Sequence, residues 1–357
     1  MDMTAYTTTK DTLGFYDATN AAGRVLALGP DALDLLHRMS TNDLRPLFGN
    51  PGKGAQTVLT SDKGRIIDLL TVIVRKSDTL LTLSAGREDL VIKWLDKFVI
   101  MENASFVSAT KEIAQFGIYG PRSMDLLKQY TSENLMTMTP LSSVAIEIAG
   151  AEVLLQKVTR IAESGWSLFV QADDADKVKQ TLQSDVLAMR GAILDDQTFE
   201  LLRIEAGIPA APNEINEKHN PLETTLVSAV SFTKGCYIGQ EVIARLDSYD
   251  KVQRHMLGIM LDGVSATSLE ELSSEITGSG QPAVTFKLET AAGEVVGELT
   301  SFIDAPTMNG MSQDRVIGLA FVRTAHANPG LRLNLRATAD KIYSAELVKL
   351  PFESSLA

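Results

Sequence analysis

The sequence predicts an α+β fold that ends in a small all-β domain, and two observations support this prediction. Over residues 1–254, amphipathic helical segments alternate with short β-rich runs, a pattern typical of α+β domains. From His255 onward, short β-like runs are separated by Gly, Pro, Asn and Ser, which indicates a small closed β domain over residues 255–357. A chain of 357 residues has room for two or three domains, at the usual ~100–200 residues each.

Apolar residues at helical spacing predict the helices. Helices are expected after Ser84, after Gly120-Pro121, and over residues 173–190, 195–207 and 240–246. The helix after Ser84 has Val91 and Leu95 on one face, and Pro121 suits the first turn of the next helix. Gly191 is a suitable residue to end the helix that precedes it.

Short runs rich in apolar and β-branched residues predict the strands. In the first region they are residues 66–74, 79–84, 151–158 and 166–170, and in the second region 256–261, 283–288, 294–302, 316–322 and 345–348. Residues 264–282 are rich in Ser, Thr, Glu and Gly, so we expect a long surface loop there.

Charge and hydropathy exclude several classes of function. The chain has 33 Lys and Arg against 45 Asp and Glu, a formal net charge of −12. An acidic surface repels phosphate backbones, so nucleic-acid binding is not expected. Residues 1–9 lack a basic region followed by an apolar core, and no apolar stretch is long enough to span a bilayer. We therefore expect a cytoplasmic protein without a membrane partner.

The cysteine and histidine content argues against a disulfide and against a metal site. Cys236 is the single cysteine, so no internal disulfide can form, which fits a reducing compartment. The four histidines are scattered, without a close pair at the spacing of metal ligands. We expect no resident metal.

The most informative segment is Lys-Gly-Cys-Tyr-Ile-Gly-Gln-Glu at residues 234–241. It follows an apolar run at 226–232 and precedes a helix-like segment, so we expect a strand-to-helix transition. Glycine permits positive φ and close backbone approach, and a helix N-terminus together with Lys234 would favour a thiolate at Cys236. From these features alone, an ordinary turn with a small buried cysteine is the simpler interpretation.

The complete string resembles the signature of the YgfZ family, within the superfamily of the glycine-cleavage T-protein. Further segments match that family in the expected order, at residues 40–43, 60–68, 120–122, 203–209, 220–223, 297–301 and 317–323. The resemblance covers nearly the whole chain. It implies a three-lobed, T-protein-like ring of domains, with two α+β lobes over residues 1–254 and a C-terminal β-barrel over 255–357.

The resemblance also implies a function. It indicates an accessory protein that binds tetrahydrofolate or a derivative in a central pocket and supports the assembly or repair of iron–sulfur enzymes. Its partners would be folate and iron–sulfur client or assembly proteins, and it would not be a classical enzyme. Cys236 would be the functional thiol, although packing of Cys236 against the folate pocket is an alternative.

The same template suggests which residues hold the folate. Glu205 matches the T-protein carboxylate that holds the pteridine, and a carboxylate can accept two hydrogen bonds from its 2-amino-4-oxo edge. Lys234 lies where the family has a basic residue near the folate, and suits an anionic glutamate tail. Tyr237 and Glu223 are further candidates. Without the resemblance, Glu205 would be interpreted as a surface residue of a capped helix.

One position departs from the aminomethyltransferase pattern. That pattern has two adjacent aspartates on the strand after a glycine-rich turn; here Asp68 matches the first, and Leu69 replaces the second. Leucine cannot accept a proton, so the accessory function is favoured. The alternative is a tetrahydrofolate-dependent aminomethyl or one-carbon transferase with Asp68 as the remaining acid–base group.

Overall fold

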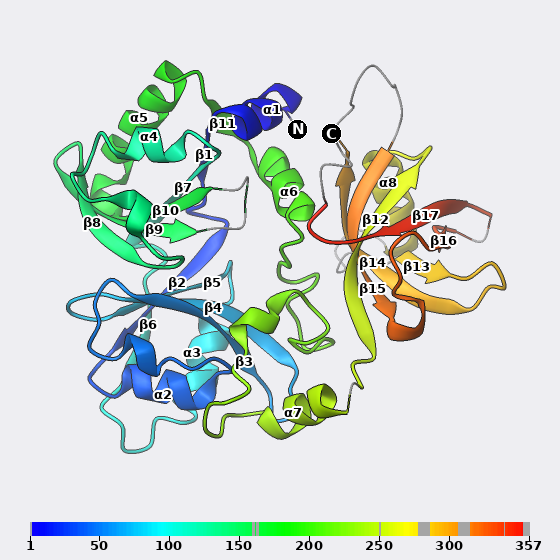
Figure 1. Ribbon diagram of the computed structural model, residues 1–357, viewed down its shortest axis with the longest axis horizontal. Coiled ribbons are helices and arrows are strands. Elements are labelled where there is room, and N and C mark those ends of the chain that lie inside the picture. Colours follow the sequence, from blue (N-terminus) through cyan, green and yellow to red (C-terminus); the bar gives the residue numbers. More distant parts are fainter. Residues whose placement is uncertain are drawn as a thin grey trace. The chain divides into compact units, whose positions relative to one another are not determined.

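The computed structural model describes residues 2–158, 161, 164–249, 251–277, 286–305, 315–338 and 340–352 (Figure 1). Contacts divide the chain into two compact units. The first unit comprises residues 1–199, 215–221 and 226–244, and the second comprises residues 200–214, 222–225 and 245–357. The second unit therefore contains the whole predicted β domain together with three short earlier stretches, residues 200–214, 222–225 and 245–254.

A five-stranded antiparallel sheet forms one layer of the first unit. Its strand order is β3 (Gly54–Thr60), β4 (Ile66–Val74), β5 (Thr79–Ser84), β2 (Ala22–Leu28) and β6 (Ser105–Ser108). Helices α2 (Ala32–Met39) and α3 (Glu88–Asp96) bury Leu35, Leu36, Val91 and Leu95 in one cluster with residues of β2 and β4. A short 3-10 helix, η1 (Arg45–Leu47), follows α2. Strands β4 and β5 have the bounds that the sequence predicts.

A six-stranded sheet forms the second layer of the first unit. Its order is β11 (Ala192–Leu194), β1 (Gly14–Asp17), β7 (Ile113–Tyr119), β10 (Gly165–Gln171), β9 (Ala151–Val158) and β8 (Ser143–Ile148). The helices that accompany this sheet are α1 (Met3–Asp11), α4 (Ser123–Leu127), η2 (Leu135–Thr137) and α5 (Ala172–Ala188).

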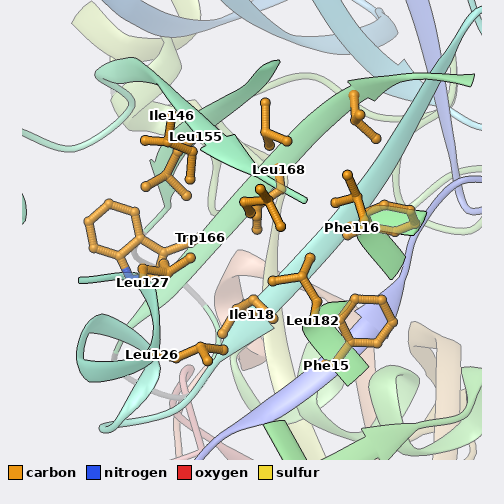
Figure 2. Packing of buried hydrophobic residues seen from close by; sticks show 14 of the residues in the cluster. Phe15, Phe116, Ile118, Leu126, Leu127, Ile146, Leu155, Trp166, Leu168 and Leu182 are labelled. Atoms are coloured by element: carbon orange, nitrogen blue, oxygen red, sulfur yellow. The ribbon is translucent and has the colours of Figure 1, made fainter. Parts of the chain in front are cut away.

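The core of this layer follows from the spacing of the apolar residues. Val178, Leu182 and Val186 recur every four residues of α5 and so lie on one face, in a cluster with Trp166 and Phe116 (Figure 2). Burying each such side chain contributes roughly 1.5–3 kcal/mol. The helix predicted over residues 173–190 and the strand at 151–158 are confirmed, whereas the helix after Gly120-Pro121 has only five residues.

The second unit contains the predicted closed β domain. The barrel has the strand order β12 (Arg254–Asp262), β15 (Arg315–Arg323), β14 (Val295–Asp304), β13 (Phe286–Glu289), β16 (Arg332–Arg336) and β17 (Ile342–Val348), with η4 (Thr324–His326) after β15. Closure pairs every strand on both sides, so the barrel has no exposed sheet edge. Of the predicted strand at 283–288, residues 283–285 lie outside the described part.

The prediction of a long loop over residues 264–282 is wrong for its first part, which forms helix α8 (Ala266–Thr277). Ser265 Oγ accepts a hydrogen bond from Ser268 N at 3.2 Å, the geometry of an N-cap. Leu269 and Leu272 are buried in the barrel cluster, so two leucines at helical spacing outweigh the polar composition around them. Residues 278–282 lie outside the described part.

Three shorter elements complete the chain: α6 (Asp196–Glu205), η3 (Leu226–Ala229) and α7 (Gln240–Ser248). Helix α6 is capped by Asp195, whose Oδ1 accepts from Thr198 N at 2.7 Å, as its sequence predicts. The strand expected before Lys234 is wrong, because the apolar run there forms η3 and a loop. No helix in the described ranges is long and apolar enough to cross a membrane.

Candidate functional site

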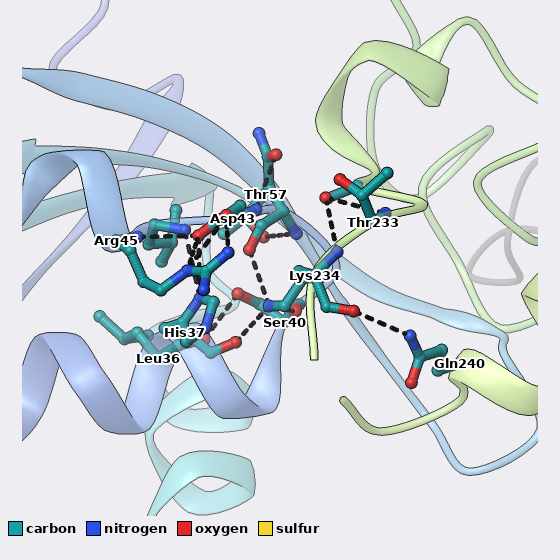
Figure 3. A network of polar contacts seen from close by, with 12 residues as sticks. Leu36, His37, Ser40, Asp43, Arg45, Thr57, Thr233, Lys234 and Gln240 are labelled. Atoms are coloured by element: carbon teal, nitrogen blue, oxygen red, sulfur yellow. Dashed lines mark hydrogen bonds and ion pairs between the residues drawn. The ribbon is translucent and has the colours of Figure 1, made fainter. Parts of the chain in front are cut away.

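The segment 234–241 begins in the loop between η3 and α7 and ends in the first turn of α7. The Lys234 side chain connects this loop to the C-terminal end of α2 by hydrogen bonds. The Lys234 ammonium donates to three backbone carbonyls, of His37, of Ser40 at 2.7 Å and of Asn42 at 2.8 Å (Figure 3). Lys234 is only 5% exposed. Burial lowers the pKa of Lys234 to about 8, so the ammonium with its three N–H donors is still the main form at neutral pH.

His37 lies beside this ammonium and is held in its neutral form. Its Nδ1 accepts a hydrogen bond from Leu44 N at 3.2 Å, so Nδ1 carries no proton. Burial, and then the positive charge of Lys234, lower the pKa of His37, and Asp43 opposes this with a carboxylate oxygen 3.7 Å from Nδ1. Protonation of His37 therefore costs more in the folded chain than in the unfolded chain.

This arrangement predicts a loss of stability in mild acid. A base with a lowered pKa binds fewer protons when folded, so the free energy of unfolding should fall as the pH drops below about 6.5 through the folded-state pKa of His37. The variant His37→Asn keeps an acceptor for Leu44 N but cannot titrate, so its stability should fall less over the same range. Urea unfolding of both proteins between about pH 5 and pH 8 measures the difference. If the free energy of unfolding falls equally with decreasing pH in both proteins, His37 is not the group responsible for the loss of stability.

Tyr237 is the second buried anchor of the loop. Its ring is 8% exposed, and its centroid lies 5.3 Å from Lys234 Nζ, a cation–π distance. Burial raises the pKa of Tyr237 to about 12, so the phenol stays neutral. The structure thus brings together two of the predicted folate-binding residues, Lys234 and Tyr237.

Gly239 is the third anchor, and only glycine fits there. Its φ is +83°, and an added Cβ would lie 2.5 Å from the Ser61 carbonyl oxygen. Next to this contact, Thr60 Oγ1 donates to the Ile238 carbonyl at 2.6 Å. The segments 40–43, 60–68 and 234–241, which share the family resemblance, therefore meet in one place.

Cys236 lies between these anchors and is itself exposed. The residue before it, Gly235, is also exposed, and a Cβ added there would meet no atom of the described residues within 4 Å. The anchors at 234, 237 and 239 fix the backbone on both sides of the thiol while leaving the thiol open to solvent. The simpler interpretation of a small buried cysteine is wrong.

Asp68 occupies a different environment, inside the first unit. It is fully buried; its Oδ1 accepts from Ser84 Oγ at 2.7 Å and from Leu69 N at 2.8 Å. Its Oδ2 has no hydrogen-bond partner among the residues that the structure describes, and it lies 3.7 Å from Arg87 Nε. Burial raises the pKa of Asp68, while Ser84 and Arg87 oppose the rise. The Asp68 carboxyl group is therefore shielded from solvent.

Glu205 and Glu223 belong to the second unit. Glu205 ends α6 half-buried, and its backbone carbonyl accepts from Phe352 N at 2.9 Å. Glu223 is 4% exposed, and its carbonyl accepts from Met256 N at 2.8 Å. Both residues are thus tied through their backbones to the strands and C-terminal segment of their own unit.

Sequence reasoning missed one buried carboxylate, Glu214. It is fully buried and accepts from Thr300 Oγ1 at 2.5 Å, from Ser301 Oγ at 2.8 Å and from Ala210 N at 3.0 Å. Arg203 lies 3.4 Å from it. A glutamate in a loop carries no sequence signal for burial, and its partners on β14 are 86 and 87 residues away along the chain.

Comparisons with known proteins agree with this architecture. The family model for the GCVT N-terminal domain matches residues 4–234. The chain is 26% identical over 309 residues to "Putative transferase At1g60990, chloroplastic" of Arabidopsis thaliana, spanning 86% of this chain but only 65% of the plant protein. It is also 26% identical over 343 residues to an aminomethyltransferase of Halothermothrix orenii, covering 95% of this chain and 88% of that protein.

A solved structure confirms the fold. The crystal structure of glycine cleavage system aminomethyltransferase T from Bartonella henselae aligns with a TM-score of 0.76 at 16% identity, covering 98% of this chain and 89% of that one. The predicted T-protein-like α+β fold with a C-terminal β-barrel is therefore confirmed. Because the family model covers well over half of its residues, the chain belongs to the GCVT N-terminal domain family.

Proposed function

We propose that this protein binds tetrahydrofolate and supports the assembly or repair of iron–sulfur enzymes, with Cys236 as its functional thiol. The observation that carries the proposal is the exposed cysteine on a loop that is anchored by the buried Lys234 and Tyr237 and by the close backbone contact at Gly239. A cysteine kept only for packing would be buried. An exposed thiol on a backbone fixed on both sides suits repeated encounters with a partner protein.

Folate enters the proposal through the family. Several relatives are aminomethyltransferases. By the T-protein pattern, Glu205 would hold the pteridine ring of the folate, and Glu223 is a further candidate for the same site. Lys234 was predicted to hold the glutamate tail, but its three N–H donors are taken by backbone carbonyls. We therefore propose that the role of Lys234 is to hold the loop that carries Cys236. Lys234 could bind the glutamate tail of the folate directly only after one of these carbonyls is released.

The alternative function, a one-carbon transferase, requires an acid–base group that reaches its substrate. Asp68 is fully buried under Ser84 and Arg87, and Leu69 replaces the second carboxylate. The discriminating assay supplies the purified protein with an aminomethyl donor and tetrahydrofolate. Steady release of ammonia with formation of methylenetetrahydrofolate would favour the transferase over the accessory protein.

Replacing Glu205 by alanine should weaken tetrahydrofolate binding. We expect the unmodified protein to bind with micromolar order affinity, roughly −8 kcal/mol. The variant should lose about 2 kcal/mol, because a charged hydrogen-bonding partner of the pteridine is removed. Titration calorimetry measures both affinities.

The matched control is Glu147→Ala, which removes an exposed glutamate from β8 and should leave the affinity unchanged. If Glu205→Ala also binds with unchanged affinity, Glu205 is not part of the site. If the unmodified protein does not bind tetrahydrofolate at millimolar concentration, the folate part of the proposal fails, whatever the role of Cys236.

A further inference from the structure

We propose that the barrel carries a separate binding pocket for a small organic anion that bears a carboxylate or phosphate group. The pocket has a volume of about 190 Å³ and is lined by Arg254, Lys287, Arg323 and Glu298 together with residues 295–297. All of these residues belong to strands β12 to β15 of the second unit (Figure 1). The inference does not depend on the proposed function of the Cys236 loop.

The strand register brings the positive charges together. Arg254 on β12 is directly opposite Arg323 on β15, and Lys287 on β13 is directly opposite Glu298 on β14. Like charges that face each other across two strands destabilise a sheet. A bound anion between the two arginines would remove this repulsion.

Much of the hydrogen-bonding capacity of these cations is unused. Within the described ranges, the Arg254 guanidinium makes one contact, 3.4 Å from Glu298 Oε1, and Lys287 Nζ makes one, 3.3 Å from Glu298 Oε2. Arg323 uses one nitrogen, which donates to Glu294 at 2.8 Å. A guanidinium has five N–H donors in a fork that matches carboxylate and phosphate, so most donors remain available.

Gly297 and Val295 line the pocket on β14. A Cβ at Gly297 would lie 2.6 Å from the Phe321 carbonyl oxygen, so the two strands are packed closely at this point. Val295 beside it is 40% exposed and supplies an apolar wall. The combination of an apolar wall and convergent cations suits a short organic body with an anionic group.

The charge balance sets the class of ligand. Arg254 and Lys287 pair with Glu298, and Arg323 pairs with Glu294, so these five side chains carry a charge of +1 on a chain of net charge −12. Nucleic acid would be repelled by the rest of the surface. The volume suits a small molecule, about six water molecules at ~30 Å³ each.

The test is titration of the full-length protein with inorganic phosphate and with glutarate at constant ionic strength, followed by calorimetry and by the NMR signals of the arginine side chains. Saturable binding of either anion is expected. The double variant Arg254→Gln, Arg323→Gln should weaken it at least about tenfold, because two charged hydrogen-bond donors are lost. Glu298→Gln should tighten it several-fold, because it removes a competing carboxylate.

Binding of glutarate alone would assign the pocket to carboxylates, and binding of phosphate alone to phosphate groups. The control is Arg332→Gln, which removes an arginine of the same barrel that pairs with Glu346 at 3.3 Å outside the pocket. An equal loss in this control would show general charge attraction and overturn the proposal. Absence of saturable binding of both anions, or weaker binding in Glu298→Gln, would overturn it as well.

Discussion

Replacing Lys234 by methionine should lower the free energy of unfolding by about 1–3 kcal/mol, the usual cost of leaving buried hydrogen-bond acceptors without a partner. Methionine keeps the length of the side chain and its apolar contacts but has no N–H donor. The carbonyls of His37, Ser40 and Asn42 would lose their partner inside the protein. An unsatisfied buried acceptor costs about 1–3 kcal/mol. Urea unfolding at pH 7 measures the change.

A matched control separates this effect from the general loss of a lysine. Lys177 is 46% exposed and pairs with Asp174 on the same helix, so Lys177→Met should change the stability by less than about 0.5 kcal/mol. A loss below about 1 kcal/mol in Lys234→Met would mean that the three carbonyls find other partners. In that case Lys234 would be available for the anionic tail of a folate.

Much of the fold could be predicted because its signals are local. Strands β4, β5 and β9 are short runs rich in apolar residues, and helix α5 repeats an apolar residue every four positions. Strand β16 was missed because two of its five residues are arginines, and only pairing with β13 and β17 makes it a strand. Helix α8 was missed because its composition is that of a loop.

The site could be predicted only in part, for the same reason. Two glycines around a cysteine mark an unusual loop, and Gly239 does have the positive φ that this pattern suggests. The partners of Lys234 lie 192 to 197 residues earlier in the chain, so no local pattern reveals that its ammonium is already satisfied. The burial of Asp68 is likewise set by Ser84 and Arg87, which reach it from another strand and the start of a helix.

Replacing Cys236 by serine should abolish most of the function while leaving the fold intact. In cells that lack this protein, we expect the variant to restore the activity of a dependent iron–sulfur enzyme at least about tenfold less well than the unmodified protein, because a hydroxyl cannot replace the nucleophilic thiolate. Because Cys236 is exposed, the free energy of unfolding should change by less than about 0.5 kcal/mol. Enzyme activity in cell extracts and urea unfolding of the purified variant measure the two effects.

The neighbouring glycines provide the controls that locate the effect at the sulfur atom. Gly235→Ala adds a methyl group that has no neighbour within 4 Å in the described part of the chain, so this variant should restore full activity. Gly239→Ala should disrupt the loop, since its Cβ would lie 2.5 Å from the Ser61 carbonyl oxygen. We expect Cys236→Ser and Gly239→Ala to lose function and Gly235→Ala to keep it. This combination of results would show that the function needs both the thiol and its fixed position. Because the chain has one cysteine, any disulfide it forms in this reaction takes its second sulfur from a partner molecule. Full restoration of activity by Cys236→Ser would leave the exposed thiol without a role in iron–sulfur metabolism.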